Sequence, residues 1–426
     1  MNEQLETRLA LERARAATEA LLEPVSDEDL VTRHSPLQSP LVWDLAHTAH
    51  FEELWVLRTA LGRPPLASHD AVHDAFRRAR LERAELPTLR PADARAYAVD
   101  VREQVLEALE DVDLEAPDAL LRHGLVFGLV IQHELRHQET MLETLQLRTD
   151  VEYPVPRASA PDRAPGGPEE VRVQEGTFVL GAVDEPWALD SELPAHEVEL
   201  PAFFVDRAPV TNGAFLEFVA DRGYEAKRLW SADGWAWRER ERAQAPLFWE
   251  RTGDGWQRIR LGRREPVPPE EPVQHVSFHE AEAFARWAGK RLPTEAEWER
   301  AAGWHDREGK LRYPWGREWV GYEANLGRRR FSPAPTGSYG GGLSPVWCVQ
   351  MAGDVWEWTS STLEPYPGFL PFPYPEDTEA FFGDGYRVLR GGSWATDALV
   401  ARTTFRNWDD PGRRQIFAGF RCARDA

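Results

Sequence analysis

Cysteine is nearly absent from this sequence of 426 residues, which contains only Cys348 and Cys422. Secreted domains that depend on disulfides use many more cysteines. We therefore expect a reducing compartment and predict a cytoplasmic protein.

Long apolar runs and excess positive charge are also lacking. No window approaches the roughly 18 uninterrupted apolar residues of a membrane-spanning helix, so we expect no membrane partner. The first residues, MNEQLETRLALERARAATEALL, are charged and lack the apolar core of a signal peptide. Lys and Arg number 50 against 71 Asp and Glu, a formal net charge of −21. A phosphate backbone would be repelled, so no nucleic-acid partner is expected.

The chain is too long for one ordinary hydrophobic core, and its two halves differ in their pattern of apolar, turn and helix-forming residues. Residues 1–150 predict a four-helix bundle from four amphipathic stretches: 3–22, 38–61, 93–113 and 118–147. Residues 151–170 hold five prolines without periodicity and predict a linker. Residues 171–426 mix short strand-like runs, turns and isolated helices. We expect a two-domain α+β protein whose second domain has much irregular backbone held by aromatic packing.

Two helices of the second domain can be located. The apolar spacing of FHEAEAFARWAGK, 278–290, predicts a helix that ends at Gly289. The next helix begins at Thr294, because Thr294 and Glu297 have the spacing of a capping box.

The stretch HELRHQET, residues 133–140, indicates a metal site. At about 100° per residue, His133 and His137 lie only about 40° apart around a helix, so both rings can reach one ion. Glu139 lies about 160° from His137 and cannot join them on a straight helix. A third ligand is therefore expected from a facing helix.

The facing helix contains WDLAHTAHFEELW, residues 43–55. His47 lies on its apolar stripe, and His50 is within about 60° of His47, so spacing does not choose between them. A lone histidine in a bundle is more often a hydrogen-bonded core residue than a ligand, but an i, i+4 pair together with one facing histidine favours a metal. A site made only of histidines suits zinc, iron, copper or nickel.

Larger stretches resemble known families. LVWDLAHTAHFEELWVLR and HELRHQETMLETLQLR resemble the DinB-like four-helix bundle of the sulfoxide synthases of ergothioneine biosynthesis. The second half is similar to the formylglycine-generating-enzyme domain, which is C-type-lectin-like, in GTFVLGA, PVTNGAFLEFV, PVQHVSFHEAEAFARWAGKRLPTEAEWERAA, YPWG, MAGDVWEWT, RVLRGGSW and FAGFRCA. The closing run TFRNWDDPGRRQIFAGFRCARD resembles the synthases closely. Together these stretches cover nearly the whole chain.

The resemblance implies an oxidoreductase, a sulfoxide synthase. It would use non-haem Fe(II) and O2 to form a C–S bond between hercynine and γ-glutamylcysteine, or cysteine. The family's three histidine ligands fall on His47, His133 and His137, which leaves Glu139 outside the ligand set.

The resemblance also implies substrate-binding residues. Asn407, Trp408, Asp409 and Arg413 match the family's substrate-binding segment. Asp409 suits the ammonium group and Arg413 a carboxylate of a γ-glutamyl donor. Arg83 stands where the family has another carboxylate-binding arginine.

The family's catalytic tyrosine lies in a Tyr-x-x-Tyr motif before the GGSW strand. The segment FPYPEDTEAFFG offers Tyr374 in the first position and Asp377 where the second tyrosine is expected. Tyr366 is the alternative if the loop register differs. The tyrosine would donate a proton during oxygen activation.

Arg136 departs from the family, which commonly has a substrate-contacting Gln at this position. It lies about 60° from His133, near the metal-facing side. A cation beside Fe(II) and a trimethylammonium group is electrostatically unusual. Either Arg136 turns to a carboxylate or the substrate pair differs from the usual one.

Four other functions are compatible with parts of the sequence. A formylglycine-generating enzyme needs reactive cysteines after RGGSW, and ATDALVARTTFRNWDDP has none, while Cys422 fits a structural role. A zinc-dependent thiol transferase would use the same three histidines, but such proteins consist of the DinB-like bundle alone and lack the second domain found here. The three intact histidines argue against a non-catalytic binding module, whose metal site would have decayed. A sister synthase that installs selenium from a selenosugar fits Asp409 and Arg413 less well than a γ-glutamyl donor does.

Overall fold

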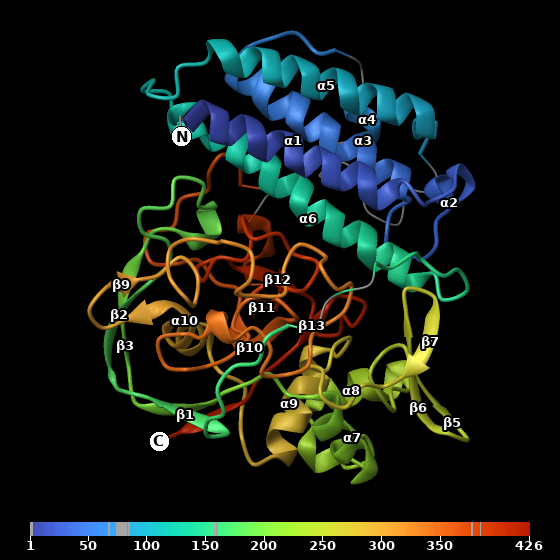
Figure 1. Ribbon diagram of the computed structural model, residues 1–426, viewed down its shortest axis with the longest axis vertical. Coiled ribbons are helices and arrows are strands. Elements are labelled where there is room, and N and C mark those ends of the chain that lie inside the picture. The colour runs from blue at the N-terminus through green and yellow to red at the C-terminus, as the bar shows by residue number, and fades with distance from the viewer. Residues whose placement is uncertain are drawn as a thin grey trace. The chain divides into compact units, whose positions relative to one another are not determined.

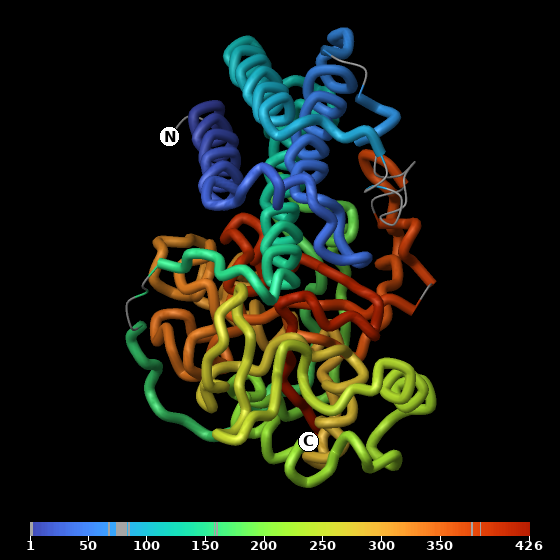
Figure 2. The backbone as a smooth tube through the Cα atoms, turned by 90° about the vertical axis from the view of Figure 1, so that its right-hand side faces the viewer, coloured from blue at the N-terminus to red at the C-terminus, as the bar shows by residue number. Residues whose placement is uncertain are grey.

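The computed structural model describes residues 3–66, 69–73, 83, 86–156, 158, 161–375, 378–383 and 385–426. The chain forms two compact units, and Figures 1 and 2 trace both from the N-terminus to the C-terminus. The first comprises Met1–Pro154 and Asp184–Trp187, and the second Val155–Val183 and Ala188–Ala426. In sequence, the boundary after Pro154 falls inside the segment predicted as a linker. Asp377 lies outside the described residues.

The first unit is a bundle of four long helices, which confirms the predicted fold class. Its long helices are α1 Glu3–Leu22, α3 Leu41–Glu52, α5 Pro91–Asp111 and α6 Leu125–Leu147 (Figure 1). Shorter elements join them: α2 Asp27–Val31, a π-helix Glu53–Ala60 that continues α3, α4 Asp70–His73, and a 3-10 turn Arg122–Gly124. Among the described residues we find no helix with the length and apolar character that a membrane crossing needs.

One predicted helix start was wrong, and one predicted helix has two geometries. The helix predicted over 118–147 begins only at Leu125, because His123 and Gly124 have φ angles of +53° and +65°. These values belong to the left-handed region, which a right-handed helix excludes. The helix predicted over 38–61 changes to π geometry at Glu53. The apolar pattern did not reveal this change, because both helix types continue the same buried stripe.

A tryptophan from a segment distant in sequence belongs to the first unit. Trp187 Nε1 donates to the His123 carbonyl at 3.0 Å, and Gln132 Nε2 donates to the Trp187 carbonyl at 2.9 Å. The indole packs against Gly128 of α6, where an added Cβ would lie 2.3 Å from a ring carbon. Only glycine leaves room for this ring.

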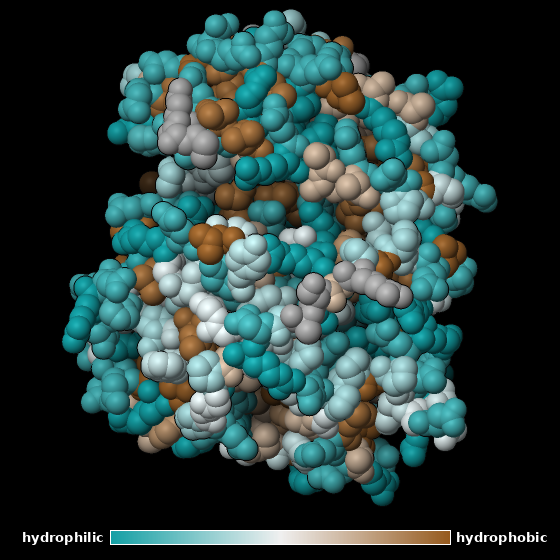
Figure 3. Space-filling view, in the orientation of Figure 1, coloured by the Kyte–Doolittle hydropathy of each residue, from teal (hydrophilic) through white to brown (hydrophobic). Residues whose placement is uncertain are grey.

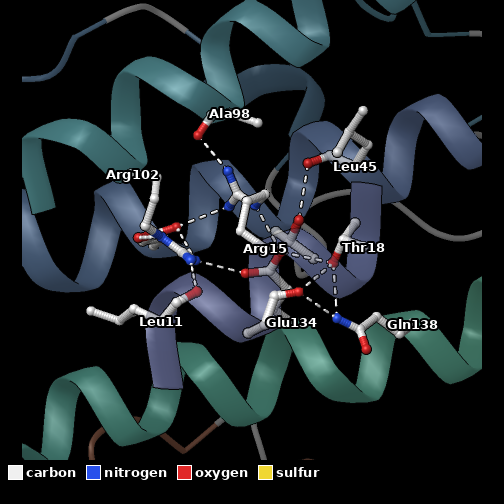
Figure 4. A network of polar contacts seen from close by, with 11 residues as sticks. Leu11, Arg15, Thr18, Leu45, Ala98, Arg102, Glu134 and Gln138 are labelled. Carbon is white, nitrogen blue, oxygen red and sulfur yellow. Dashed lines mark hydrogen bonds and ion pairs between the residues drawn. The ribbon is translucent and has the colours of Figure 1, made fainter. Parts of the chain in front are cut away.

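Four buried charges hold the four long helices together (Figure 4). Arg15 of α1 contacts Glu134 of α6 at 2.8 Å and Glu52 of α3 at 3.0 Å. Arg102 of α5 contacts each of these glutamates at 2.7 Å. Burial alone would raise the pKa of Glu134, but the two guanidinium groups outweigh it and lower that pKa to about 2. Glu134 is therefore ionised at neutral pH.

The second unit combines short strands and helices. Its main sheet has the strand order β12-β11-β10-β13, and a second sheet has the order β1-β4-β14. The strands are β1 Glu170–Val173, β2 Gly176–Leu180, β3 His196–Leu200, β4 Phe203–Asp206, β5 Trp249–Thr252, β6 Gly255–Arg260, β7 Arg263–Pro266, β8 Trp304–His305, β9 Gly309–Lys310, β10 Trp356–Thr362, β11 Arg387–Arg390, β12 Asn407–Asp409, β13 Ala418–Gly419 and β14 Ala423–Asp425. The helices are α7 Asn212–Ala220, α8 Ala232–Glu241, α9 Phe278–Trp287 and α10 Glu295–Gly303.

The capping box predicted at the start of α10 is confirmed. The Thr294 hydroxyl accepts from the Glu297 N–H at 3.1 Å, and the Glu297 carboxylate accepts from the Thr294 N–H at 2.7 Å. The preceding helix, α9, ends at Trp287, two residues before the predicted stop at Gly289. Gly289 has a φ of +70°, so it marks the turn that follows the helix.

Ion pairs stabilise the irregular backbone of the second unit, in addition to the aromatic packing that was expected. The fully buried side chains include four arginines, each paired with a glutamate: Arg390 with Glu299, Arg402 with Glu192, Arg406 with Glu295 and Arg421 with Glu357. Each guanidinium also donates to backbone carbonyls of neighbouring loops. These donations satisfy carbonyl groups that have no strand partner.

Replacing Arg102 by Met should destabilise the bundle by about 3–5 kcal/mol, because Glu52 and Glu134 would lose a buried counter-charge. We expect a lower free energy of unfolding in urea, followed by helical circular dichroism. Arg90→Met removes an exposed pair with Asp93 at the start of the same helix and is the matched control. Its unfolding midpoint should match that of the unmodified protein. Equal losses in both variants would contradict the role of the buried network.

Candidate metal centre

Three histidines from two helices converge inside the bundle. His47 lies on α3, and His133 and His137 lie one turn apart on α6. The ring centroids are 4.9 Å apart for His47 and His133, 4.8 Å for His47 and His137, and 4.5 Å for His133 and His137. Imidazoles that share one ion at about 2.1 Å have centroids roughly 4.5–5.3 Å apart. The three rings therefore have the spacing that one metal ion requires.

The outer ring nitrogens of these histidines have different surroundings. His47 Nδ1 lies 2.7 Å from the carbonyl oxygen of His73, and His137 Nδ1 lies 3.1 Å from Asp44 Oδ1. Nδ1 of His133 is buried and has no hydrogen-bond partner among the described residues. With Nδ1 of His47 and His137 engaged, the Nε2 atoms of these rings are available to a metal.

Aromatic rings fix two of the histidines in place. Trp43 stacks on His47 at 4.5 Å, and Phe51 stacks on His133 at 3.7 Å. Burial, followed by the nearby ring of His137, lowers the pKa of both His47 and His133 well below the ordinary value. Both rings are therefore neutral at pH 7, and neutral imidazole is the form that binds a metal.

The two other candidate ligands lie outside this group. His50 Nε2 is 2.9 Å from Asp70 Oδ1, and Arg58 contacts the same carboxylate at 2.7 Å. Glu139 is buried on α6 and is not part of the histidine group. Between the two histidines that spacing left open, the structure brings His47 to the α6 pair.

Two predicted arginines lie near the histidines. The guanidinium of Arg83 stacks over Trp43 at 4.0 Å, and Trp43 in turn stacks on His47. Arg136 is partly exposed on α6, and its charge is one of the causes that lower the pKa of His133, after burial and the two neighbouring histidines. In the described part of the chain no carboxylate pairs with Arg136. The expectation that Arg136 turns to a carboxylate is therefore not met among these residues.

The other predicted substrate-binding residues belong to the second unit. Asn407, Trp408 and Asp409 form β12, at the edge of the main sheet. Arg413 Nε lies 3.7 Å from Asp409 Oδ1, and both side chains are partly exposed. Arg413 Nη1 has no hydrogen-bond partner among the described residues. Asp409 and Arg413 therefore present opposite charges side by side.

The two candidate tyrosines differ in accessibility. Tyr374 is partly exposed in the loop between β10 and β11. Tyr366 is buried, its hydroxyl donates to Glu295 at 2.7 Å, and Arg406 lies 4.1 Å over its ring. Burial raises the pKa of Tyr366 well above the ordinary value. Tyr366 is thus engaged in the core, which favours Tyr374 as the residue that a substrate can reach.

Both cysteines are fully buried in the second unit. Burial raises the pKa of Cys348 to about 11 and that of Cys422 well above the ordinary value. A buried thiol with a raised pKa is unreactive. Neither residue therefore offers the thiol that formylglycine generation needs.

Sequence reasoning missed two groups around the histidines, the Asp44 carboxylate and the His73 carbonyl. Asp44 lies three residues before His47, and residues with this spacing share a helix face. That spacing could have indicated it. The His73 carbonyl carries no sequence signal, because every residue has one.

Comparison with known families agrees with this arrangement. Residues 10–141 match the DinB superfamily, and residues 156–426 match the Sulfatase-modifying factor enzyme 1-like domain. Fold and site thus define a two-domain protein in which a DinB-type bundle carries a three-histidine centre.

Full-length relatives narrow the family. Hercynine oxygenase of Mycobacterium tuberculosis is 48% identical over 99% of both chains, and hercynine oxygenase of Mycolicibacterium smegmatis is 47% identical over 99% of both chains. The chain belongs to the hercynine oxygenase family and is an oxidoreductase. The formylglycine-generating enzyme of Streptomyces coelicolor is 36% identical, over 60% of this chain and 89% of its own. That similarity does not span the whole chain.

Single replacement of His47, His133 or His137 by Ala should abolish stoichiometric metal binding, because two imidazoles hold an ion far less tightly than three. The measurement is the iron content after anaerobic loading with Fe(II) and desalting. His50→Ala and Glu139→Ala are the matched controls and should retain the metal. Iron lost from Glu139→Ala but kept by His47→Ala would contradict this ligand set.

Proposed function

We propose that the protein is an Fe(II)- and O2-dependent sulfoxide synthase that joins the sulfur of γ-glutamylcysteine to hercynine. The observation that carries the proposal is the group of three histidines on α3 and α6, which provides a non-haem iron site with open positions. The names of the full-length relatives support hercynine as one substrate.

The proposed reaction balances without a further co-reactant. One hercynine C–H, one thiol S–H and one O2 give one sulfoxide and one water. Forming the C–S bond and oxidising the sulfur supply the four electrons that O2 accepts. Fe(II), held by the three histidines, supplies the redox chemistry of O2.

Asp409 and Arg413 recognise the amino-acid end of the sulfur donor in this proposal. The Asp409 carboxylate accepts from the ammonium group, and the Arg413 guanidinium donates to the α-carboxylate. Nη1 of Arg413 is buried and has no hydrogen-bond partner among the described residues, which supports this role, since a bound carboxylate would satisfy it. Asn407 and Trp408 on the same strand complete the segment.

Arg83 and Arg136 supply positive charge beside the histidines. Arg83 is held on Trp43 and is proposed to bind a substrate carboxylate. Arg136 is proposed to bind a second anionic group, since no carboxylate of the described protein neutralises it. A thiolate near the metal would also gain from these two cations.

Tyr374 is the proposed proton donor. A phenol is neutral at pH 7 and can deliver a proton during oxygen reduction without adding an anion. The partial exposure of Tyr374 supports this role over Tyr366, whose hydroxyl is occupied by Glu295.

The proposal is tested by loading the protein anaerobically with Fe(II) and then adding air, hercynine and a panel of sulfur donors. The products are identified by mass. Sulfoxide formed from γ-glutamylcysteine supports the proposal, and product from cysteine alone changes the assigned donor. Product formed only from a selenosugar indicates the selenium-inserting reaction. Transfer of an intact thiol with Zn(II) and without O2 indicates a thiol transferase.

Replacing Asp409 by Ala or Arg413 by Ala should raise the KM for the thiol, because a charged substrate group would be left unpaired at a cost of about 2–5 kcal/mol. The KM for hercynine should change little. Steady-state kinetics with each substrate varied separately measures both values. An unchanged thiol KM in both variants would show that the donor binds elsewhere.

Tyr374→Phe keeps the ring and removes only the hydroxyl. Binding of both substrates should change little, because neither needs this proton in the ground state. Without the proton donor we expect O2 consumption to shift from the sulfoxide toward simple oxidation of the thiol. The ratio of sulfoxide to oxidised thiol per O2 measures this shift. If this ratio were unchanged in Tyr374→Phe and fell sharply in Tyr366→Phe, Tyr366 would be the proton donor instead.

A further inference from the structure

The three histidines differ in what holds their outer nitrogens. A carboxylate faces Nδ1 of His137, a backbone carbonyl faces Nδ1 of His47, and no described group bonds Nδ1 of His133. Only the first partner carries a formal charge. The three rings are therefore unequal before any metal binds.

Asp44 is built into the bundle where it can act on the facing helix. It lies in the first turn of α3, one turn before His47, and is only 1% exposed. Its Oδ1 reaches His137 on α6 at 3.1 Å. One helix thus supplies a histidine ligand and also the group that contacts a ligand of the other helix.

A buried carboxylate has a defined effect on an imidazole. It accepts a hydrogen bond from Nδ1–H, which fixes the proton on Nδ1 and leaves the Nε2 lone pair for the metal. Its negative charge increases the basicity of the ring, and low solvent exposure strengthens this effect. A carbonyl oxygen fixes the tautomer in the same way but adds no charge.

We propose that Asp44 is the positioning residue of the metal centre, and that it makes His137 the strongest of the three ligands. His47 is oriented by the His73 carbonyl, and His133 is held by its stacking on Phe51. This inference rests on the metal site of the proposed function. It concerns how tightly and in what geometry this chain holds the ion.

A second histidine–aspartate pair in the same unit provides the control. His50 and Asp70 form a hydrogen bond of 2.9 Å, yet His50 lies outside the histidine group. Asp70 is more exposed than Asp44 and also contacts Arg58, so its replacement controls for the loss of a histidine–aspartate hydrogen bond. An effect on the metal should appear only at Asp44.

The experiment compares Asp44→Asn with Asp70→Asn by titrating Co(II) against a chelator of known affinity. Both variants keep the side-chain volume and replace the carboxylate by a neutral amide. We expect Co(II) affinity to fall about 10- to 100-fold in Asp44→Asn and to stay within about twofold of the unmodified protein in Asp70→Asn. The ligand-field absorption spectrum should also change only in Asp44→Asn. Equal affinities in all three proteins, or equal losses in both variants, would overturn the proposal.

A measurement on the unmodified protein keeps the test independent of how the variants fold. Protons on the rings of Co(II)-bound histidines give strongly shifted NMR signals. We expect an exchangeable ring proton on His137, assigned through its neighbours and protected from solvent exchange. A His137 without such a proton would bind through Nδ1, and Asp44 could not play this part. Failure of the unmodified protein to bind Co(II) would instead contradict the proposed metal site itself.

Discussion

The bundle depends on the contact between two arginines and two glutamates at its centre. Arg15, Glu52, Arg102 and Glu134 come one from each long helix, and each arginine contacts both glutamates. Removing charges from water is unfavourable, so such a group is stable only when every charge has its partners. All four helices must therefore be in register at the same time. The network is therefore satisfied only in this packing of the bundle.

That register determines where the histidines lie. Glu134 directly follows His133 on α6, and Glu52 lies five residues after His47 on α3. The contacts of both glutamates with the same two arginines fix α3 against α6. The hydrogen bond between Asp44 and His137 then joins the same two helices a second time. A metal centre assembled from two helices needs this precision, because its ligand atoms must meet at one point.

Part of this arrangement follows from the sequence and part does not. The period of the apolar residues predicted the four helices, and the spacing of His133 and His137 predicted a shared ion. Spacing could not choose between His47 and His50, because both lie on the bundle side of α3. His50 is excluded by its hydrogen bond with Asp70. Asp70 lies in a part of the chain without a periodic apolar pattern, so this contact could not be predicted. The start of α6 was missed because His123 and Gly124 adopt positive φ angles, which the apolar pattern does not indicate. The buried arginines of the second unit also could not be foreseen, since an arginine in a sequence is expected on the surface.

The small segment that ends at Trp187 limits how the chain can be divided. The sequence suggests a cut near the prolines after position 150, and a fragment ending at Pro154 would contain all four helices and all three histidines. It would lack Trp187, whose indole fills the space above Gly128 on the helix that carries His133 and His137. The hydrogen bonds of Trp187 with the His123 carbonyl and the Gln132 side chain would be lost as well. Residues 1–154 therefore do not contain the whole core of the bundle, and the shortest N-terminal piece that contains it extends to residue 187.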